Sequence, residues 1–268
     1  MDNLLTERRR HMWRFSQSRA VVWILRVLVV VVPVLAWQWG ASVGFVDDFL
    51  YSSPARIAEA FRDWVRDGTL LRASLHTVRS AMIGYIIGTL AGIGVALLFH
   101  QKPRVAAVYM PVVTAMNAVP RIIFAPLFVL VFGYSWLGSA ALVILVVLFI
   151  AFFTTYKGLA SLDPVFTSWG ELNGFSSWEM WRHIKFPAVV GWLTASMRTT
   201  IGISFSAAIV AEFLGMPEGL GALIQRGLLE FRPASILASL VAVALIVILI
   251  DAILRLVERT MSTWATDR

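Results

Sequence analysis

Long apolar runs alternate with short charged segments along most of the chain. Three runs, 27–46, 80–101 and 233–250, contain no Lys, Arg, Asp or Glu. A helix needs about 20 mostly apolar residues to cross a bilayer, so each run has the length of one membrane span. The pattern predicts spanning helices at about 22–42, 79–99 and 235–256.

The middle of the chain contains an uncharged stretch that is too long for one span and too short for two. Residues 122–156 would rise roughly 52 Å as a single helix, whereas two spans need roughly 60 Å and a turn. The glycine-containing segment 132–138 is typical of a turn. The first helix must therefore begin upstream of Arg121, and we predict spans at about 105–132 and 138–156.

A fifth apolar segment, 188–211, can also cross the membrane although it contains Arg198, which brings the predicted spans to six. A secretory signal peptide is an alternative for 1–42, but the apolar run is too long and no convincing cleavage site follows it. We therefore predict an all-α integral membrane protein with one transmembrane domain over residues 21–262.

The overall composition agrees with this class. The chain of 268 residues is 59% hydrophobic and 15% charged, and its mean hydropathy is +0.77, whereas a soluble domain is about 45–50% apolar and about 25% charged. The absence of cysteine excludes disulfides, thiolate nucleophiles and Cys-ligated metals. The four histidines are scattered without metal-ligand spacing.

The basic residues predict the orientation. With six spans both termini share one side, and placing them in the cytoplasm puts fourteen Lys/Arg inside and seven outside. The basic N-terminus 1–20 and the tail 263–268 are then cytoplasmic. The net charge of +7 therefore marks the cytoplasmic side and does not indicate a nucleic-acid partner.

The charged segment 54–73 is predicted to form an external amphipathic helix. Ser53 can cap its start, and Pro54 suits the first helical turn. Its apolar residues recur at helical spacing on one face. The helix is expected to lie on the membrane surface, with a solvated loop helix as the alternative.

The cytoplasmic loop 157–187 contains signals for two short helices. Asp163 followed by proline predicts the start of the first, and Gly174 fits the position after its end. Ser176 or its neighbour can cap a second helix, 178–185, that ends at Pro187. A structured loop of this kind is suited to insertion into a groove on a partner protein.

The second half of this loop resembles the cytoplasmic motif E-A-A-x3-G-x9-I-x-L-P of ABC-importer permeases. Gly174 is followed after nine residues by Ile184, and Pro187 closes the motif. The first half differs, because Ser168-Trp169-Gly170 occupies the E-A-A positions. In addition, Phe186 replaces the leucine of the motif. The nearest glutamate, Glu171, lies three residues after the position of the motif's glutamate.

The resemblance implies that the loop docks into a cleft on a separate ATPase dimer, which uses ATP and Mg. The chain itself has no phosphate-binding G-x-x-x-x-G-K-[ST] motif, so it is expected to bind no cofactor and to be a transport subunit, not an enzyme. The residues expected to contact the ATPase are Ser168, Glu171, Leu172, Asn173, Gly174, Phe175, Ser176, Ile184 and Pro187.

Other segments are similar to the sulfonate/nitrate/taurine branch of these permeases: 49–54, 74–77, 120–133, 211–221 and 255–259. The resemblance covers roughly residues 46–260 and implies the type I importer permease fold in the bacterial cytoplasmic membrane. It also implies an extracytoplasmic binding protein and a second permease copy, which we expect to form a homodimer. The expected solute is small and anionic, such as a sulfonate, taurine or nitrate, with pyrimidine-type precursors as an alternative.

Polar residues inside predicted spans are candidates for the translocation pathway or gate, because charge is costly in a membrane. Arg121, after Pro120, could line a path for anions or satisfy carbonyls freed at the proline. Asn117 could serve the pathway or bridge two helices. For Arg198, pairing or snorkelling is favoured over ligand contact. Glu212 could pair with an arginine in a gate or fold back onto a neighbouring helix N-terminus.

Two other function classes fit the sequence less well. A membrane-embedded enzyme would need clustered catalytic groups, and the chain contains no H-E-x-x-H, no G-x-S-x-G and no Cys. An ion-coupled secondary transporter would show broken helices at matching positions of two halves, whereas only the predicted third span contains several prolines. Three glycines at four-residue spacing, Gly84, Gly88 and Gly92, predict a close helix contact, internal or with a second copy.

Overall fold

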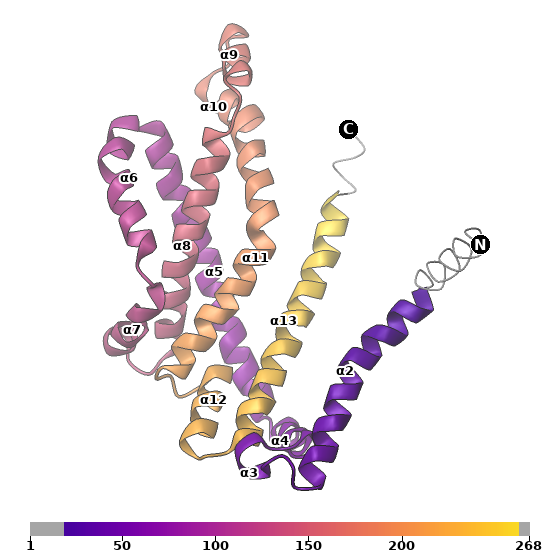
Figure 1. Cartoon of the computed structure of the whole chain (residues 1–268). Coiled ribbons are helices and arrows are strands. Elements are labelled where there is room, and N and C mark those ends of the chain that lie inside the picture. The colour runs from indigo at the N-terminus through magenta and orange to yellow at the C-terminus, as the bar shows by residue number, and fades with distance from the viewer. Residues whose placement is uncertain (1–18, 263–268) are drawn as a thin grey trace, which may run out of the picture.

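The computed structural model describes residues 19–262, and this part of the chain consists of helices joined by short connections (Figure 1). The long helices run alternately up and down. In chain order the elements are α2 Arg19–Ser42, α3 Asp48–Tyr51, α4 Pro54–Arg66, α5 Thr69–Gln101, α6 Pro103–Ala118, the 3-10 helix η1 Arg121–Phe124, α7 Ala125–Phe132, α8 Trp136–Ala160, α9 Pro164–Leu172, α10 Ser177–Met180, the π-helical segment η2 Trp181–Lys185, α11 Phe186–Phe213, α12 Leu220–Leu229 and α13 Pro233–Ser262.

Within residues 19–262, five helices are long and apolar enough to cross a membrane, and the bent pair formed by α6 and η1–α7 is a sixth when counted as one broken span. The described start of α2 and the end of α13 lie toward the same end of the molecule as α9 and α10 (Figure 1). The predicted N-terminal segment falls mostly on residues 1–18, which lie outside the described residues together with the tail 263–268.

The boundary between the predicted external helix 54–73 and the span 79–99 was wrong. Helix α4 ends at Arg66, and α5 already begins at Thr69. Gly68 separates them with a φ of +76°, a conformation that glycine adopts readily. The Asp67 carboxylate accepts a hydrogen bond from the Thr69 backbone at 2.8 Å, and this bond lowers the pKa of Asp67.

Helix α4 begins as predicted but packs on the bundle. The Ser53 hydroxyl accepts from the Arg56 backbone N–H, and Pro54 occupies the first turn. Phe61 and Trp64 of α4 pack against a buried cluster that includes Leu220 of α12 and residues of α5 and α13. The amphipathic face thus covers other helices of this chain.

The predicted third span, 105–132, is broken at Pro120 into α6 and the η1–α7 unit. The axes of α6 and of the η1–α7 unit differ by 83°. Val119 and Pro120 are both extended at the break, with ψ of 130° and 105°. Proline disfavours the helical conformation in the residue before it, which accounts for Val119. Pro111, by contrast, is accommodated inside α6.

Helices α5 and α8 form the closest contact in the bundle, along the predicted glycine face. A Cβ atom on Gly84 would lie 2.5 Å from the side chain of Val143, and one on Gly92 would lie 2.5 Å from the carbonyl oxygen of Leu148. A Cβ atom on Gly88 would lie 2.9 Å from the carbonyl oxygen of Ile144. The glycines therefore serve internal packing, which was one of the two alternatives.

Helix α11 begins further upstream than the predicted span 188–211. Ser177–Phe213 forms one continuous helical stretch that includes η2. The prediction that a short helix ends at Pro187 was wrong, since Pro187 lies in the first turn of α11, where a missing N–H is tolerated. The predicted loop 157–187 likewise shrinks, because α8 continues to Ala160.

Candidate coupling segment and transport pathway

The segment 163–187, called here the coupling segment, protrudes beyond the long helices at the top of Figure 1. Asp163 caps α9 by accepting from the Val165 backbone at 2.8 Å. Ser176 and Glu179 form a capping box that begins α10. Gly174 between the two helices has a φ of +72°, as its predicted position after a helix end requires.

Close packing holds α9 against the helix that follows it. Gly170 is buried, and a Cβ there would lie 2.8 Å from the Met180 methyl and 3.1 Å from Ile184. Trp169 and Phe175 add an edge-to-face ring contact, with 5.4 Å between ring centroids. Gly170 departs from the family motif in sequence, and its packing role was not predicted.

Large apolar side chains cover the outer surface of the coupling segment. Leu172 is 88% exposed, Val165 67% and Trp178 66%. Of the nine residues expected to contact an ATPase, Phe175 and Ile184 are half-buried. The exposed ones are Ser168, Glu171, Leu172, Asn173, Gly174, Ser176 and Pro187.

Arg121 lies at the break between α6 and α7 and turns back onto the end of α6. Its guanidinium donates to the Asn117 backbone carbonyl at 3.2 Å and to the Asn117 side-chain oxygen. It also lies over the ring of Phe149, 5.0 Å from the centroid. The arrangement matches the alternative in which Arg121 satisfies groups freed by Pro120, and its buried Nε has no hydrogen-bond partner among the described residues.

Arg198 pairs with an acidic residue of another helix. Its guanidinium forms a two-point ion pair with Asp251 of α13, in which Nη2 and Oδ2 are 2.8 Å apart. The ion pair joins α11 to α13. This pairing agrees with the structural interpretation of Arg198.

Glu212 is fully buried and anchors the start of α12. Its carboxylate accepts from Thr77 Oγ1 at 2.8 Å and from the Gly221 backbone at 3.1 Å, and it lies 3.3 Å from His76 Nδ1. Thr77 in turn accepts from the Leu220 backbone at 3.0 Å. We call these five residues the Glu212 network.

The Glu212 network matches the expectation that Glu212 folds back onto a neighbouring helix N-terminus, where the unpaired N–H groups of a helix favour an anion. Sequence reasoning missed His76 and Thr77, which lie on α5. Gly219 and Gly221 leave room for the carboxylate, since a Cβ on Gly219 would lie 2.1 Å from Glu212 Cδ. A glutamate followed by two closely spaced glycines was the only available signal.

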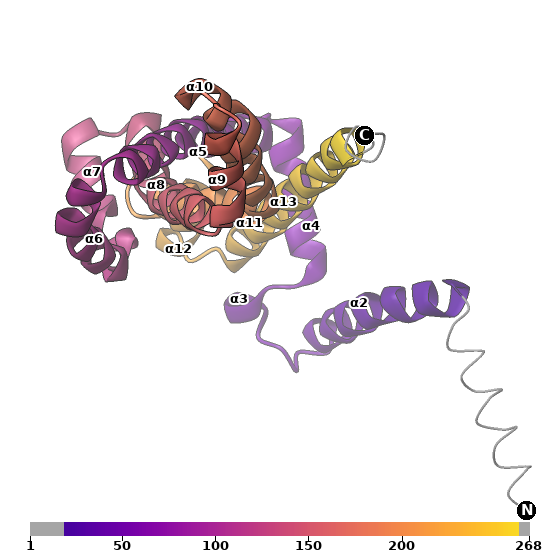
Figure 2. The ribbon, with the colours of Figure 1, turned by 90° about the horizontal axis from the view of Figure 1, so that it is seen from above.

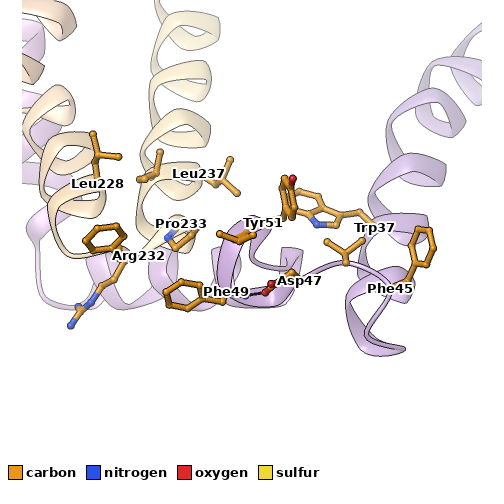
Figure 3. A pocket seen from close by; sticks show the side chains of 13 residues that line it. Trp37, Phe45, Asp47, Phe49, Tyr51, Leu228, Arg232, Pro233 and Leu237 are labelled. Carbon is orange, nitrogen blue, oxygen red and sulfur yellow. Dashed lines mark hydrogen bonds between the residues drawn. The ribbon is translucent and has the colours of Figure 1, made fainter.

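A groove of about 820 Å³ separates the α2–α3 region from α12 and α13 (Figure 3). Its walls carry Trp37 and Tyr51 on one side and Leu228 and Leu237 on the other, and Phe49 of α3 lies below them in the view of Figure 3. Helix α2 itself stands apart from the other long helices when the molecule is seen from above (Figure 2). None of its spanning window is buried.

Comparison with known proteins decides the family. Residues 84–263 match the family described as binding-protein-dependent transport system inner membrane component, and this match covers more than half of the chain. The chain belongs to this family. A solved structure of a bacterial ABC transporter that imports the acidic polysaccharide alginate has a TM-score of 0.60 at 14% identity, covering 94% of this chain and 98% of that one, and so shows the same fold.

Relatives of similar length are transport permeases, and two of them are named for sulfonates or taurine. The permease named for aliphatic sulfonates transport in Bacillus subtilis is 23% identical over 90% of this chain and 88% of its own. The taurine transport system permease protein of Escherichia coli is 23% identical over 98% of both chains. The riboflavin transport system permease protein of Chloroflexus aurantiacus is 26% identical over 85% of both.

These matches establish the type I importer permease fold and the class of function. The protein is a multi-pass membrane permease subunit of an ABC importer and not an enzyme. As a family of binding-protein-dependent importers implies, it works with an ATPase and a binding protein.

Proposed function

We propose that the permease forms part of the pathway for a small anionic solute and is driven by an ATPase dimer bound to the coupling segment. The α9–α10 end and both termini then lie in the cytoplasm, and the α4–α12 end faces the binding protein. The ATPase supplies the ATP and Mg chemistry, while this chain changes conformation.

The exposed apolar surface of the coupling segment carries this proposal. Leu172 is almost fully exposed at an end of the bundle that projects away from the spanning helices (Figure 1). Apolar side chains gathered outside both the core and the membrane are typical of a protein–protein contact. The capped helices and the tight Gly170 contact hold this surface in a defined shape, which favours docking.

Replacing Leu172 by Asp in the full importer tests the coupling proposal. We expect the ATPase to be lost on co-purification and ATP-driven uptake to fall roughly tenfold or more, because an exposed anchor at an interface is typically worth about 2 kcal/mol or more. Thermal unfolding of the permease itself should not change.

Leu229→Asp is the matched control, since Leu229 of α12 is 72% exposed at the opposite end of the bundle. It should leave ATPase binding intact. Equal ATPase recovery for the Leu172 and Leu229 variants would exclude the coupling segment as the docking site.

An anionic solute is supported by the basic group at the broken span. Only Nη2 of Arg121 binds Asn117, so the guanidinium has further N–H donors. A sulfonate oxygen is a strong acceptor for a guanidinium. Relatives named for sulfonates and taurine favour such a solute, while the relative named for riboflavin leaves the solute to be measured. Uptake of labelled taurine against labelled riboflavin distinguishes the two.

The homodimer is supported by helix α2, which stands apart from the other long helices (Figure 2). Val29 and Val30 are both exposed, on a helix whose apolar residues face all directions. Together with the apolar groove of Figure 3, α2 offers a contact for a second copy. Cross-linking of differently tagged copies tests this, and recovery of single copies only would contradict it.

A further inference from the structure

A polar pocket lies at the end of the bundle opposite the coupling segment, between the start of α5 and the segment that enters α12. Its volume is about 260 Å³. Its wall on the α5 side contains Thr69 and Arg72, and its other wall contains Arg226. Elements far apart in sequence thus bring two guanidinium groups to one small pocket.

Backbone carbonyls hold both arginine side chains in place. Arg72 Nη2 donates to the Asp67 carbonyl at 3.4 Å, and Arg226 Nη2 donates to the Pro217 carbonyl. A guanidinium has five N–H donors, so most of them remain available. Within residues 19–262, neither arginine lies within ion-pair distance of a carboxylate, although the Asp67 carboxylate attracts Arg72 at longer range. Glu218 is the single acidic residue that lines the pocket.

The neighbouring Glu212 network does not account for the two arginines. Gly219 lines the pocket and lies directly over Glu212, but the carboxylate is fully buried behind it and bonds to Thr77 and the Gly221 backbone. The start of α12 is therefore already satisfied from inside. The side chains of Arg72 and Arg226 are exposed and therefore accessible to a ligand.

We infer that Arg72 and Arg226 form an anion-binding subsite that receives the sulfonate or carboxylate group of the solute before it enters the membrane. Two guanidinium groups with free N–H donors match the oxygens of such a group, and Thr69 adds a hydroxyl. The volume suits a small solute and is below that of ordinary drug-sized pockets. The inference rests on the proposed anionic solute and on the proposed orientation.

Binding of methanesulfonate to the purified importer tests the subsite by titration calorimetry. Dimethyl sulfone serves as a neutral probe of similar shape. We expect wild type to bind methanesulfonate but not the sulfone, and Arg72→Gln or Arg226→Gln to weaken binding roughly tenfold or more. Arg226→Lys should retain part of the affinity, which shows that the fold is intact.

Arg66→Gln is the matched control, since Arg66 is exposed on α4 and lines none of the described pockets. It should bind methanesulfonate like wild type. Equal affinities of the Arg72, Arg226 and Arg66 variants, or equal binding of the neutral sulfone, would overturn the subsite.

A third result assigns the arginines to another role. If the double variant of Arg72 and Arg226 loses affinity for the binding protein while methanesulfonate affinity is unchanged, the pair is a docking surface and the subsite is wrong. Failure of the subsite leaves ATPase binding by Leu172 untouched. If the Leu172 test fails, Arg226→Gln is still expected to bind methanesulfonate more weakly than Arg66→Gln. The coupling proposal and the subsite can therefore be rejected independently.

Discussion

At one end of α11, Glu212 is fully buried and bonded to α5 and α12. At the other end, α11 continues from the coupling segment, where Leu172 is almost fully exposed. At the Glu212 end, the buried polar groups bond to one another within the chain. At the coupling segment, apolar side chains such as Leu172 stay exposed among the described residues. Changes at the Glu212 end should therefore alter stability, and changes at the coupling segment should alter assembly with the ATPase.

The largest effect on stability is expected for Glu212→Ala. The substitution leaves the buried Gly221 N–H without its acceptor and the Thr77 hydroxyl with the Ala73 carbonyl alone. An unsatisfied buried group costs about 1–3 kcal/mol, and the cavity left by the side chain adds to that cost. We expect a loss of about 3 kcal/mol or more in unfolding free energy, followed in detergent by tryptophan fluorescence.

Glu212→Gln keeps an acceptor oxygen and should fall between wild type and Glu212→Ala. Glu218→Ala, an exposed neighbour, should change little. An unfolding curve for Glu212→Ala that superimposes on wild type would show that the Glu212 network does not hold α12.

A medium effect is expected for Gly92→Ala in the contact between α5 and α8. The new methyl group would lie 2.5 Å from the Leu148 carbonyl oxygen, so the two helices must separate. Overpacking of this kind costs about 1–3 kcal/mol.

Gly94 of the same helix is the matched control, because a Cβ added there would point into open space, with no other described atom within 4 Å. Gly94→Ala should be neutral or stabilising by up to about 1 kcal/mol, because alanine favours helix. Equal unfolding midpoints for the Gly92 and Gly94 variants would contradict the close α5–α8 contact.

The smallest effect is expected for the Arg198–Asp251 pair. The two side chains lie on helices long and apolar enough to cross the membrane, where polar contacts between helices contribute about 0.6–2 kcal/mol. A double-mutant cycle with Arg198→Gln and Asp251→Asn should give a coupling energy in that range. A coupling of several kcal/mol would place Arg198 among the groups on which the fold depends.

Much of the fold was predictable, because the charge-free runs indicate the approximate positions of most spanning helices. Ser53, Asp163 and Ser176 marked helix starts for the same reason in each case, namely a side-chain oxygen that accepts from the first turn. The glycine spacing of α5 predicted a packing face, although its partner α8 could not be read from one sequence.

The errors have physical causes. Arg72 and Arg79 made the first turns of α5 look extramembrane, but a helix continues outside the bilayer as readily as within it. Pro187 was predicted to end a helix, whereas proline is equally suited to the first turn of one. The partners of Glu212 were not predictable, because His76 lies 136 residues away in sequence.

The central claim is that the coupling segment touches the ATPase. The chain contains no cysteine, so Leu172→Cys introduces a single thiol. In the full importer with a bifunctional thiol–amine reagent, we predict a cross-link from position 172 to the ATPase subunit and none from Leu229→Cys at the opposite end. Absence of the first cross-link in an importer that still hydrolyses ATP on addition of solute would contradict this claim.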